Sequence, residues 1–235
     1  SSDNKYINVI LDKTPFYAQS GGQVGDIGVL ENENLKLKVN NTIKNTSGIF
    51  IHEAEIISGN VSNGDELFAK VDKNFRNAVA RNHSGAHLLQ AALRAVLGNH
   101  VEQAGQLVNE RQIRFDFTHF SALTRDELDQ VENMVNEKIL LGLAGKIEEM
   151  PITKAKEMGA VALFNEKYGD VVRVVSFGDF SIELCGGTHV DNTAKLGLFK
   201  ILSESSVASG VRRIEAVTGL GVLDLLNKNI SIIED

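Results

Sequence analysis

Residues 72–98 read DKNFRNAVARNHSGAHLLQAALRAVLG, and this stretch decides the fold. Its apolar side chains recur at helical spacing, and a glycine, Gly98, follows the last of them; the stripe consists of Phe75, Ala78, Val79, Ala86, Leu89, Leu93 and Val96. This periodicity predicts a long amphipathic helix that ends at the glycine. Before Asp72 the apolar residues alternate instead, so the chain changes there from strands to helix.

The region before the helix is predicted to be β-structure. Apolar and polar residues alternate over residues 6–11, 35–39, 49–51 and 67–71. Clusters of Gly, Asn, Ser and Asp separate these runs, as is typical of turns. Several short strands at this spacing predict a small barrel or a barrel-like sheet.

Helices and strands are mixed after residue 98. Thr124 and Glu127 form a capping-box pattern that predicts a helix to about Leu141, and shorter patterns predict helices at 153–158 and 220–233. Strand-like runs occupy 171–177, 181–185, 198–203 and 211–217. The predicted fold class is therefore α+β, with a small N-terminal β-barrel-like subdomain (1–71) packed on an α/β two-layer core (72–235).

Composition excludes several classes of protein. Asp and Glu number 31 against 24 Lys and Arg, and the formal charge of −7 argues against a globally basic nucleic-acid binder. The longest apolar tract of interest, residues 139–145, is far shorter than a membrane helix. The single cysteine, Cys185, excludes an internal disulfide and fits a reducing compartment, so we expect a cytoplasmic protein. We also expect a segment of a longer chain, because there is no initiator Met and the end reads as an interrupted helix.

Two short motifs predict a metal site. His83 and His87 lie four residues apart on the flank of the apolar stripe, where a helix meets a cleft, and therefore share a face. Ser84 stands where a metalloprotease helix has its glutamate, so that reading is discarded. In Cys185-Gly-Gly-Thr-His189 a glycine turn can bring His189 back beside Cys185. Three imidazoles and a thiolate favour zinc over magnesium or calcium.

The remaining histidines, His52, His100 and His119, have no partner motif and are predicted to be ordinary surface or core residues.

Four stretches resemble a known family. They are TPFYAQSGGQVGD (14–26), RNHSGAHLL (81–89), IELCGGTH (182–189) and GVRRIEAVTG (210–219). Together they resemble the editing domain of bacterial alanyl-tRNA synthetase; free-standing editing factors and the threonyl-tRNA synthetase editing domain share parts of the pattern. Departures at Gly85-Ala86, Gln106 and Asn165 leave all four metal-ligand positions in place.

The resemblance implies an aminoacyl-tRNA deacylase that hydrolyses tRNA(Ala) mischarged with serine or glycine. It implies zinc held by His83, His87, Cys185 and His189, and a β-barrel packed on an α/β core. It also implies a parent ATP-dependent ligase whose aminoacylation and C-terminal domains would be this segment's partners. Class II synthetase motifs are not recognisable here, so we do not expect this chain to charge tRNA by itself.

Candidate substrate contacts follow from the same motifs. A site that rejects alanine must hydrogen-bond the serine hydroxyl, and the candidates are Thr14, Gln23 and Gln103. Gly21, Gly22 and Gly25 either let the backbone approach the terminal adenosine or form a hairpin turn with positive φ; Asp26 closes this motif. Phosphate contacts are predicted for basic residues that are otherwise a solvated face: Arg81, Arg212 and Arg213, with Lys73, Arg76, Lys195 and Lys200.

Several alternatives stay open. Zinc can polarise the ester carbonyl, bind the α-amine or lower the pKa of water, yet four protein ligands are typical of a closed, structural site. If the site is structural, the chain is a tRNA-binding module in which zinc only holds the docking surface together and no reaction takes place. A free-standing editing factor and a zinc hydrolase of a small metabolite are further readings, and the sequence identifies no general base.

Overall fold

The computed structural model describes residues 5–162 and 169–234. Contacts divide the chain into two compact units, 1–77 and 78–235, so that the division falls within helix α1 (Lys73–Leu97). The boundary at residue 71 stays a prediction. Asn165, one of the departures from the family pattern, lies outside the described residues.

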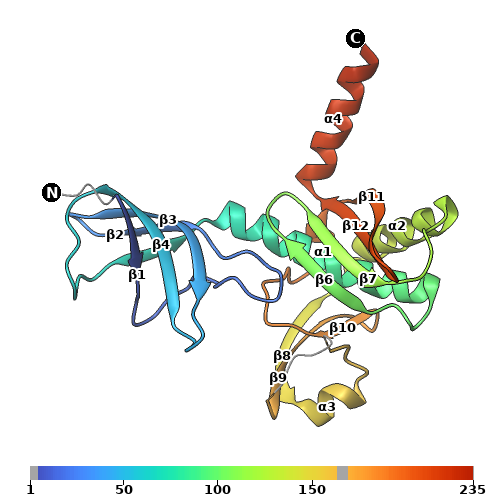
Figure 1. Cartoon of the computed structure of the whole chain (residues 1–235), viewed down its shortest axis with the longest axis horizontal. Helices are drawn as coiled ribbons and strands as arrows, with labels where there is room; N and C mark the ends of the chain where they lie inside the picture. Colours follow the sequence, from blue (N-terminus) through green and yellow to red (C-terminus); the bar gives the residue numbers. More distant parts are fainter. Residues whose placement is uncertain (1–4, 163–168, 235) are drawn as a thin grey trace. The chain divides into compact units, whose positions relative to one another are not determined.

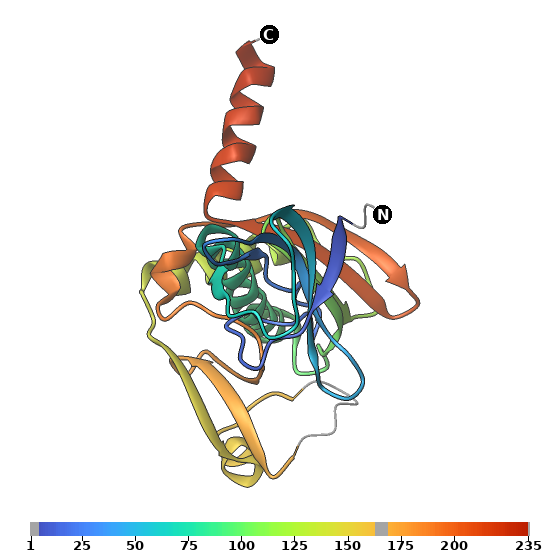
Figure 2. The same cartoon turned by 90° about the vertical axis from the view of Figure 1, so that its left-hand side faces the viewer.

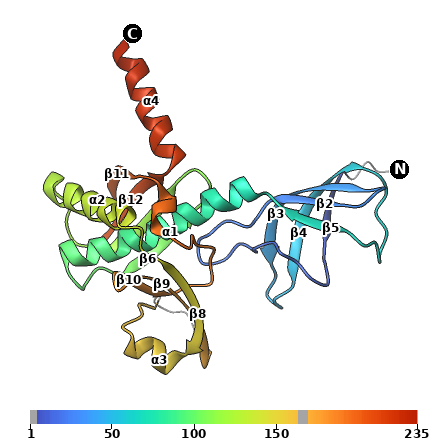
Figure 3. The same ribbon diagram turned by 180° about the vertical axis from the view of Figure 1, so that it is seen from behind.

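The first unit is an antiparallel sheet with the strand order β1-β4-β3-β2-β5. Figure 1 labels β1 to β4, and Figure 3 labels β5. Strand β3 shows why these residues form it, because Leu37 and Val39 are buried while Lys36 and Lys38, between and beside them, are exposed. The inward side chains join a buried cluster that includes Phe16, Leu30 and Leu37. The strands are β1 (Tyr6–Val9), β2 (Gly28–Glu31), β3 (Lys36–Lys44), β4 (Phe50–Ser58) and β5 (Phe68–Val71).

This sheet is open, and here the barrel implied by the resemblance needs correction. Among the described residues no ladder joins β1 to β5, so these strands do not form a closed barrel. The two edge strands have four residues each and leave Tyr6 and Phe68 largely exposed. Closure would require β1 and β5 to pair with a fixed stagger, and that pairing is absent among the described residues.

In the second unit, α1 lies between two antiparallel sheets (Figure 3). On one side, a Cβ at Gly85 would touch Ile113 and Thr218 of the four-stranded sheet, ordered β11-β12-β7-β6. On the other side, the ring of His87 meets Phe177 of the three-stranded sheet, ordered β10-β9-β8. The strands are β6 (Gln103–Val108), β7 (Ile113–Thr118), β8 (Gly145–Pro151), β9 (Val171–Phe177), β10 (Ser181–Leu184), β11 (Phe199–Ala208) and β12 (Val211–Thr218).

In the described part of the chain, three more helices and a 3-10 turn follow α1. Helix α2 (Arg125–Leu140) begins with the predicted capping box of Thr124 and Glu127, and its Asn136 hydrogen-bonds both backbone groups of Phe199 in β11. Helix α3 (Ile152–Glu157) follows β8, and α4 (Leu220–Glu234) extends away from the four-stranded sheet (Figure 2). A 3-10 turn, η1, spans Thr193–Leu196. Among the described helices, none combines the length and the apolar run needed to cross a bilayer.

The predicted α+β class is confirmed, and the predicted helices are all present within a few residues. Four strands were not predicted: β2, β6, β7 and β8. Strand β7, with buried Ile113, Phe115 and Phe117, alternates regularly and its pattern was available in the sequence.

Candidate metal centre

Helix α1 carries the first two candidate ligands on one face. His83 and His87 are four residues apart, and their ring centroids lie 5.2 Å from one another. Both side chains are buried, with exposed fractions of 2% and 4%. The sequence predicted a flank that meets a cleft, whereas both histidines lie in a stretch of α1, residues 82–90, in which every residue is buried.

The turn after β10 carries the other two. Cys185 and His189 flank Gly186-Gly187, and the N–H of Gly187 donates to Cys185 Sγ at 3.3 Å. The Sγ lies 3.3 Å from His189 Nε2 and 3.5 Å from His83 Nε2. The predicted return of His189 to Cys185 is therefore present.

The four side chains form one cluster. One ligand atom from each of His83, His87, Cys185 and His189 lies within 4.8 Å of all the others. In a tetrahedral zinc site, sulfur and nitrogen ligands bound at about 2.3 and 2.0–2.1 Å lie about 3.6 Å apart. The sulfur–nitrogen distances of 3.3 and 3.5 Å fit that geometry closely. The donor set therefore fits a zinc-sized ion.

The protonation of the histidines also suits a metal. Burial and the positive charge of Arg173 lower the pKa of His83 to about 3. Burial and the neighbouring imidazoles lower the pKa of His87 and His189 well below the ordinary value. Neutral imidazole is the form that binds metals, so these residues need not lose protons first at neutral pH.

Ser84 contacts Nδ1 of His189, the ring nitrogen that does not face Cys185. Its Oγ lies 3.2 Å from His189 Nδ1 and accepts the backbone N–H of Val190 at 3.1 Å. Since Nε2 of His189 faces Cys185, Nδ1 carries the ring proton and donates it to Ser84 whenever Nε2 binds a cation. The serine that replaces a metalloprotease glutamate thus serves a different purpose here.

Glu183 lies beside His87 in the same way. Its Oε2 is 3.5 Å from His87 Nε2, and both side chains are buried. Burial raises the pKa of Glu183 to about 8, although the hydrogen bond from Ser181 Oγ lowers it. Among the described residues, no group hydrogen-bonds the buried Nδ1 of His87. A buried nitrogen without a partner fits a lone pair reserved for a cation.

Sequence reasoning missed Ser84, Glu183 and Arg173 as neighbours of the ligands. Arg173 and Cys185 exchange hydrogen bonds across β9 and the turn, and its charge bears on all three histidines. One signal was available for Glu183, because it shares a strand face with Cys185. That polar face is buried as well as the apolar one, with Ser181 and Glu183 exposed by only 3% and 7%.

The glycine-rich loop belongs to the first unit. Gly21 and Gly22 have positive φ angles of 56° and 81°, as the hairpin-turn reading required. A Cβ on Gly25 would lie 2.0 Å from the carbonyl oxygen of Thr42, so β3 already explains this glycine. Gln23 is exposed by only 1%, and its backbone pairs with Ser20.

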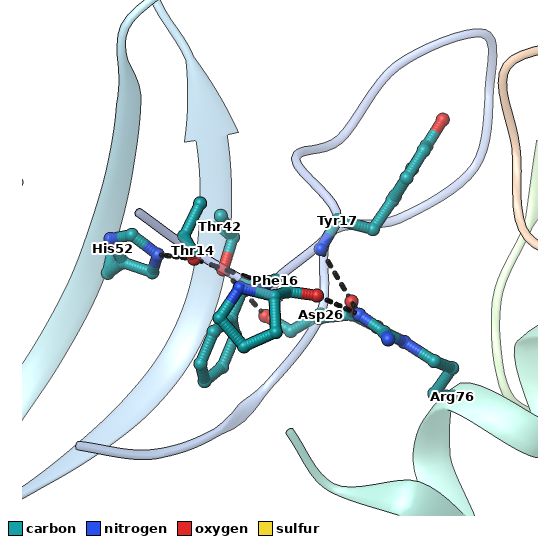
Figure 4. A network of polar contacts seen from close by, with 8 residues as sticks. Thr14, Phe16, Tyr17, Asp26, Thr42, His52 and Arg76 are labelled. Carbon is teal, nitrogen blue, oxygen red and sulfur yellow. Dashed lines mark hydrogen bonds and ion pairs between the residues drawn. The ribbon is translucent and has the colours of Figure 1, made fainter. Parts of the chain in front are cut away.

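Asp26 secures this loop. Its carboxylate accepts the N–H of Tyr17 at 2.6 Å and forms an ion pair with Arg76, which also donates to the carbonyl of Pro15 at 2.6 Å (Figure 4). With an exposed fraction of 2%, Asp26 is placed for structure. Its predicted substrate contact, like that of the glycines, stays a prediction.

Gln103 lies at the start of β6, an edge strand of the second unit, beside a register shift. Such bulges redirect side chains and are common next to functional sites. The half-buried side chain of Gln103 suits a contact with a ligand, although its role stays a prediction.

The basic residues predicted to hold phosphates are mostly paired with acidic ones. Arg213 is bidentate to Asp116 at 2.6 and 2.7 Å, and Arg212 is paired with Glu204. Three more of these basic residues form ion pairs: Lys195 with Asp191, Lys200 with Glu132 and Arg76 with Asp26. Lys73 is exposed, and Arg81 lines a pocket beside Gly219 and Leu223. Pairing reduces the positive field that each can offer to a phosphate.

Two protein-family models match the chain. The family described as the threonyl and alanyl tRNA synthetase second additional domain matches residues 172–215, which include Cys185 and His189. The family described as class II (A) tRNA synthetases matches residues 1–75.

Curated relatives match almost the whole chain. The alanine–tRNA ligase of Acetivibrio thermocellus is 56% identical over 229 residues, or 97% of this chain and 26% of that protein. The enzymes of Bacillus subtilis and Clostridioides difficile are 51% and 54% identical, again over 26% of their length. The chain thus spans about a quarter of the length of these relatives.

Proposed function

We propose that this chain, a segment of the alanyl-tRNA synthetase family, is the editing domain that hydrolyses tRNA(Ala) mischarged with serine or glycine. The observation that carries the proposal is the convergence of His83, His87, Cys185 and His189 on one point. Ligation of alanine to tRNA is the activity that the relatives' name describes, and we assign it, with the use of ATP, to the parts of a longer chain beyond this segment.

The reaction is the hydrolysis of an ester. Water adds its oxygen to the aminoacyl carbonyl, the bond to the 3′ ribose oxygen breaks, and that oxygen takes a proton. A zinc ion held by the four side chains would supply positive charge for the ester carbonyl or the α-amine. Zinc is favoured over magnesium because the donors are three imidazoles and a thiolate.

The chain's own residues keep the site ordered and positively charged. Ser84 and Glu183 contact two of the ligand imidazoles and fix their orientation. Arg173 places a permanent positive charge near the cluster, where it also stabilises negative charge that develops on a carbonyl oxygen. Gln103, Thr14 and Gln23 are the residues we assign to the recognition of the aminoacyl group.

A second function has one specific observation in its favour. Four protein donors complete a tetrahedron, which is the pattern of structural zinc sites. In that case the metal only holds α1 and the turn after β10 together, and the unit binds tRNA without hydrolysing an ester.

The first experiment separates the two. Purified chain is incubated with Ser-tRNA(Ala), Gly-tRNA(Ala) and Ala-tRNA(Ala), with and without a chelator, and beside a Cys185→Ala variant. We expect loss of the seryl and glycyl esters only, abolished by the chelator and by the variant. Zinc-loaded chain that binds the tRNA but leaves every ester intact would refute the deacylase and support the binding module. Competition by uncharged acceptor-stem RNA distinguishes a tRNA ester from a small metabolite as substrate.

A further inference from the structure

A buried histidine lies directly behind Thr14 in the first unit. His52 on β4 has an exposed fraction of 0%, and its Nε2 is 2.7 Å from Thr14 Oγ1 (Figure 4). Its other nitrogen, Nδ1, is 3.0 Å from the carbonyl oxygen of Val9. The imidazole edge-stacks on Phe16, with ring centroids 5.2 Å apart. His52 was predicted to be an ordinary surface or core residue, and nothing in the proposed reaction uses it.

The two hydrogen bonds fix where the proton of His52 resides. A carbonyl oxygen only accepts, so Nδ1 must carry the hydrogen that bonds to Val9. Burial lowers the pKa of His52, and the ring is therefore neutral near pH 7. A neutral imidazole has one proton, which leaves Nε2 as an acceptor.

The orientation of the Thr14 hydroxyl follows from this. With Nε2 accepting, the hydroxyl of Thr14 donates its only proton to His52. One of its lone pairs accepts the N–H of Phe16 at 3.1 Å. A second lone pair remains, because a hydroxyl has one donor and two acceptor positions. Thr14 can therefore accept one more hydrogen bond and can donate none.

We propose that His52 is a positioning residue that makes Thr14 a pure hydrogen-bond acceptor toward the aminoacyl group. This inference rests on the proposed function, and it explains one part of the selectivity. A seryl ester carries a hydroxyl that can donate to Thr14, whereas the methyl group of an alanyl ester cannot. A glycyl ester has no side chain to donate, so the pair His52–Thr14 serves serine alone.

The same contacts have a purely structural explanation that the test must separate. Thr14 and His52 also tie the loop to β4, and losing that tie would loosen the whole first unit. Such loosening lowers the hydrolysis of seryl and glycyl esters alike. A role in accepting the serine hydroxyl lowers the seryl reaction and leaves the glycyl reaction in place.

The orientation itself is measured without any substrate. In the ¹⁵N-labelled chain we expect His52 to show a protonated Nδ1 and a bare, hydrogen-bonded Nε2 at pH 7. Replacing Thr14 by Val should move the Nε2 resonance and leave Nδ1 unchanged. A protonated Nε2 in the unmodified chain would overturn the inference, because Thr14 would then be free to donate.

Two variants of His52 test the role. His52→Asn keeps a donor for Val9 but no longer reaches Thr14, whereas His52→Gln keeps an acceptor where Nε2 was. We expect His52→Asn to lower the ratio of seryl to glycyl hydrolysis about tenfold, the factor that one neutral hydrogen bond supplies, and His52→Gln to recover most of it. The matched control His100→Asn removes another hydrogen-bonded histidine, in the second unit, and should leave the ratio unchanged.

The outcomes are distinguishable. An unchanged ratio in His52→Asn, or an equal loss of both reactions, would overturn the inference while the proposed function stands. No hydrolysis of either ester by the unmodified chain would overturn the proposed function and with it the selectivity role. The NMR measurement would still decide the orientation of the Thr14 hydroxyl.

Discussion

Replacing Ser84 by Ala should weaken metal binding without removing a ligand. The Oγ of Ser84 lies 3.2 Å from His189 Nδ1 and accepts the N–H of Val190 at 3.1 Å, and the side chain is completely buried. Alanine fits the same space but accepts neither proton. The ring of His189 then loses the contact that sets its orientation and its tautomer.

The two hydrogen bonds of Ser84 contribute to different quantities, one to stability and one to metal affinity. The bond from Val190 is present with and without metal, so its loss lowers the free energy of unfolding by about 1 kcal/mol in both forms. The bond from His189 strengthens when Nε2 binds a cation, and its loss falls on the metal-bound form. Contacts of this kind are worth about 10- to 100-fold in metal affinity, or about 1.4–2.7 kcal/mol.

The assay is a competition titration of metal-free chain with zinc against a chromophoric chelator. Asn82→Ala is the matched control, because Asn82 is equally buried on α1 but hydrogen-bonds Asn109 and Thr218 instead of a ligand. Both variants should lose stability, and only Ser84→Ala should lose affinity. The same dissociation constant in Ser84→Ala and in the unmodified chain, or an equal loss in Asn82→Ala, would refute the reasoning.

Three further predictions concern other residues. Glu183→Ala should weaken zinc binding about tenfold, because alanine leaves no oxygen beside Nε2 of His87 to orient its imidazole; titration against the same chelator checks this, and unchanged affinity would contradict it. Burial lowers the pKa of His52 in the folded chain, so below about pH 6.5 the unfolded chain binds more protons and stability should fall as the pH falls. Urea unfolding of the unmodified chain and His52→Asn between pH 7.5 and about 5 tests this, and parallel pH profiles would argue against it. Gly25→Ala should cost about 1–3 kcal/mol, because its Cβ would meet the carbonyl oxygen of Thr42, while zinc affinity in the other unit stays the same; a melting temperature equal to that of the unmodified chain would exclude the predicted clash.

Features that depend only on residues close together in the sequence could be predicted from the sequence. The capping box of Thr124 and Glu127 depends on residues three apart, and it is present as predicted. The metal cluster was predictable because spacing on a helix and a glycine turn each aim two ligands at one point. Those motifs needed no knowledge of which strands pair.

Contacts that depend on how distant segments of the chain pair could not be predicted from local sequence patterns. Arg213 was expected to face phosphate, but the pairing of β12 with β7 sets it opposite Asp116, 97 residues earlier in the chain. Ser84 likewise reaches His189 across 105 residues. No periodicity within either segment indicates these neighbours, so charge and hydroxyl partners had to come from the structure.

The spacing of the metal ligands along the chain has a consequence for folding. An ion that joins His83 to Cys185 closes a loop of 102 residues in a protein whose single cysteine rules out an internal disulfide. A cross-link over about 100 residues removes about 4.7 kcal/mol of chain entropy from the unfolded state in the simplest model. The ion would thus tether the first helix of the second unit to a turn made much later in synthesis. A nascent chain would receive that tether only after the last ligand, His189, has emerged.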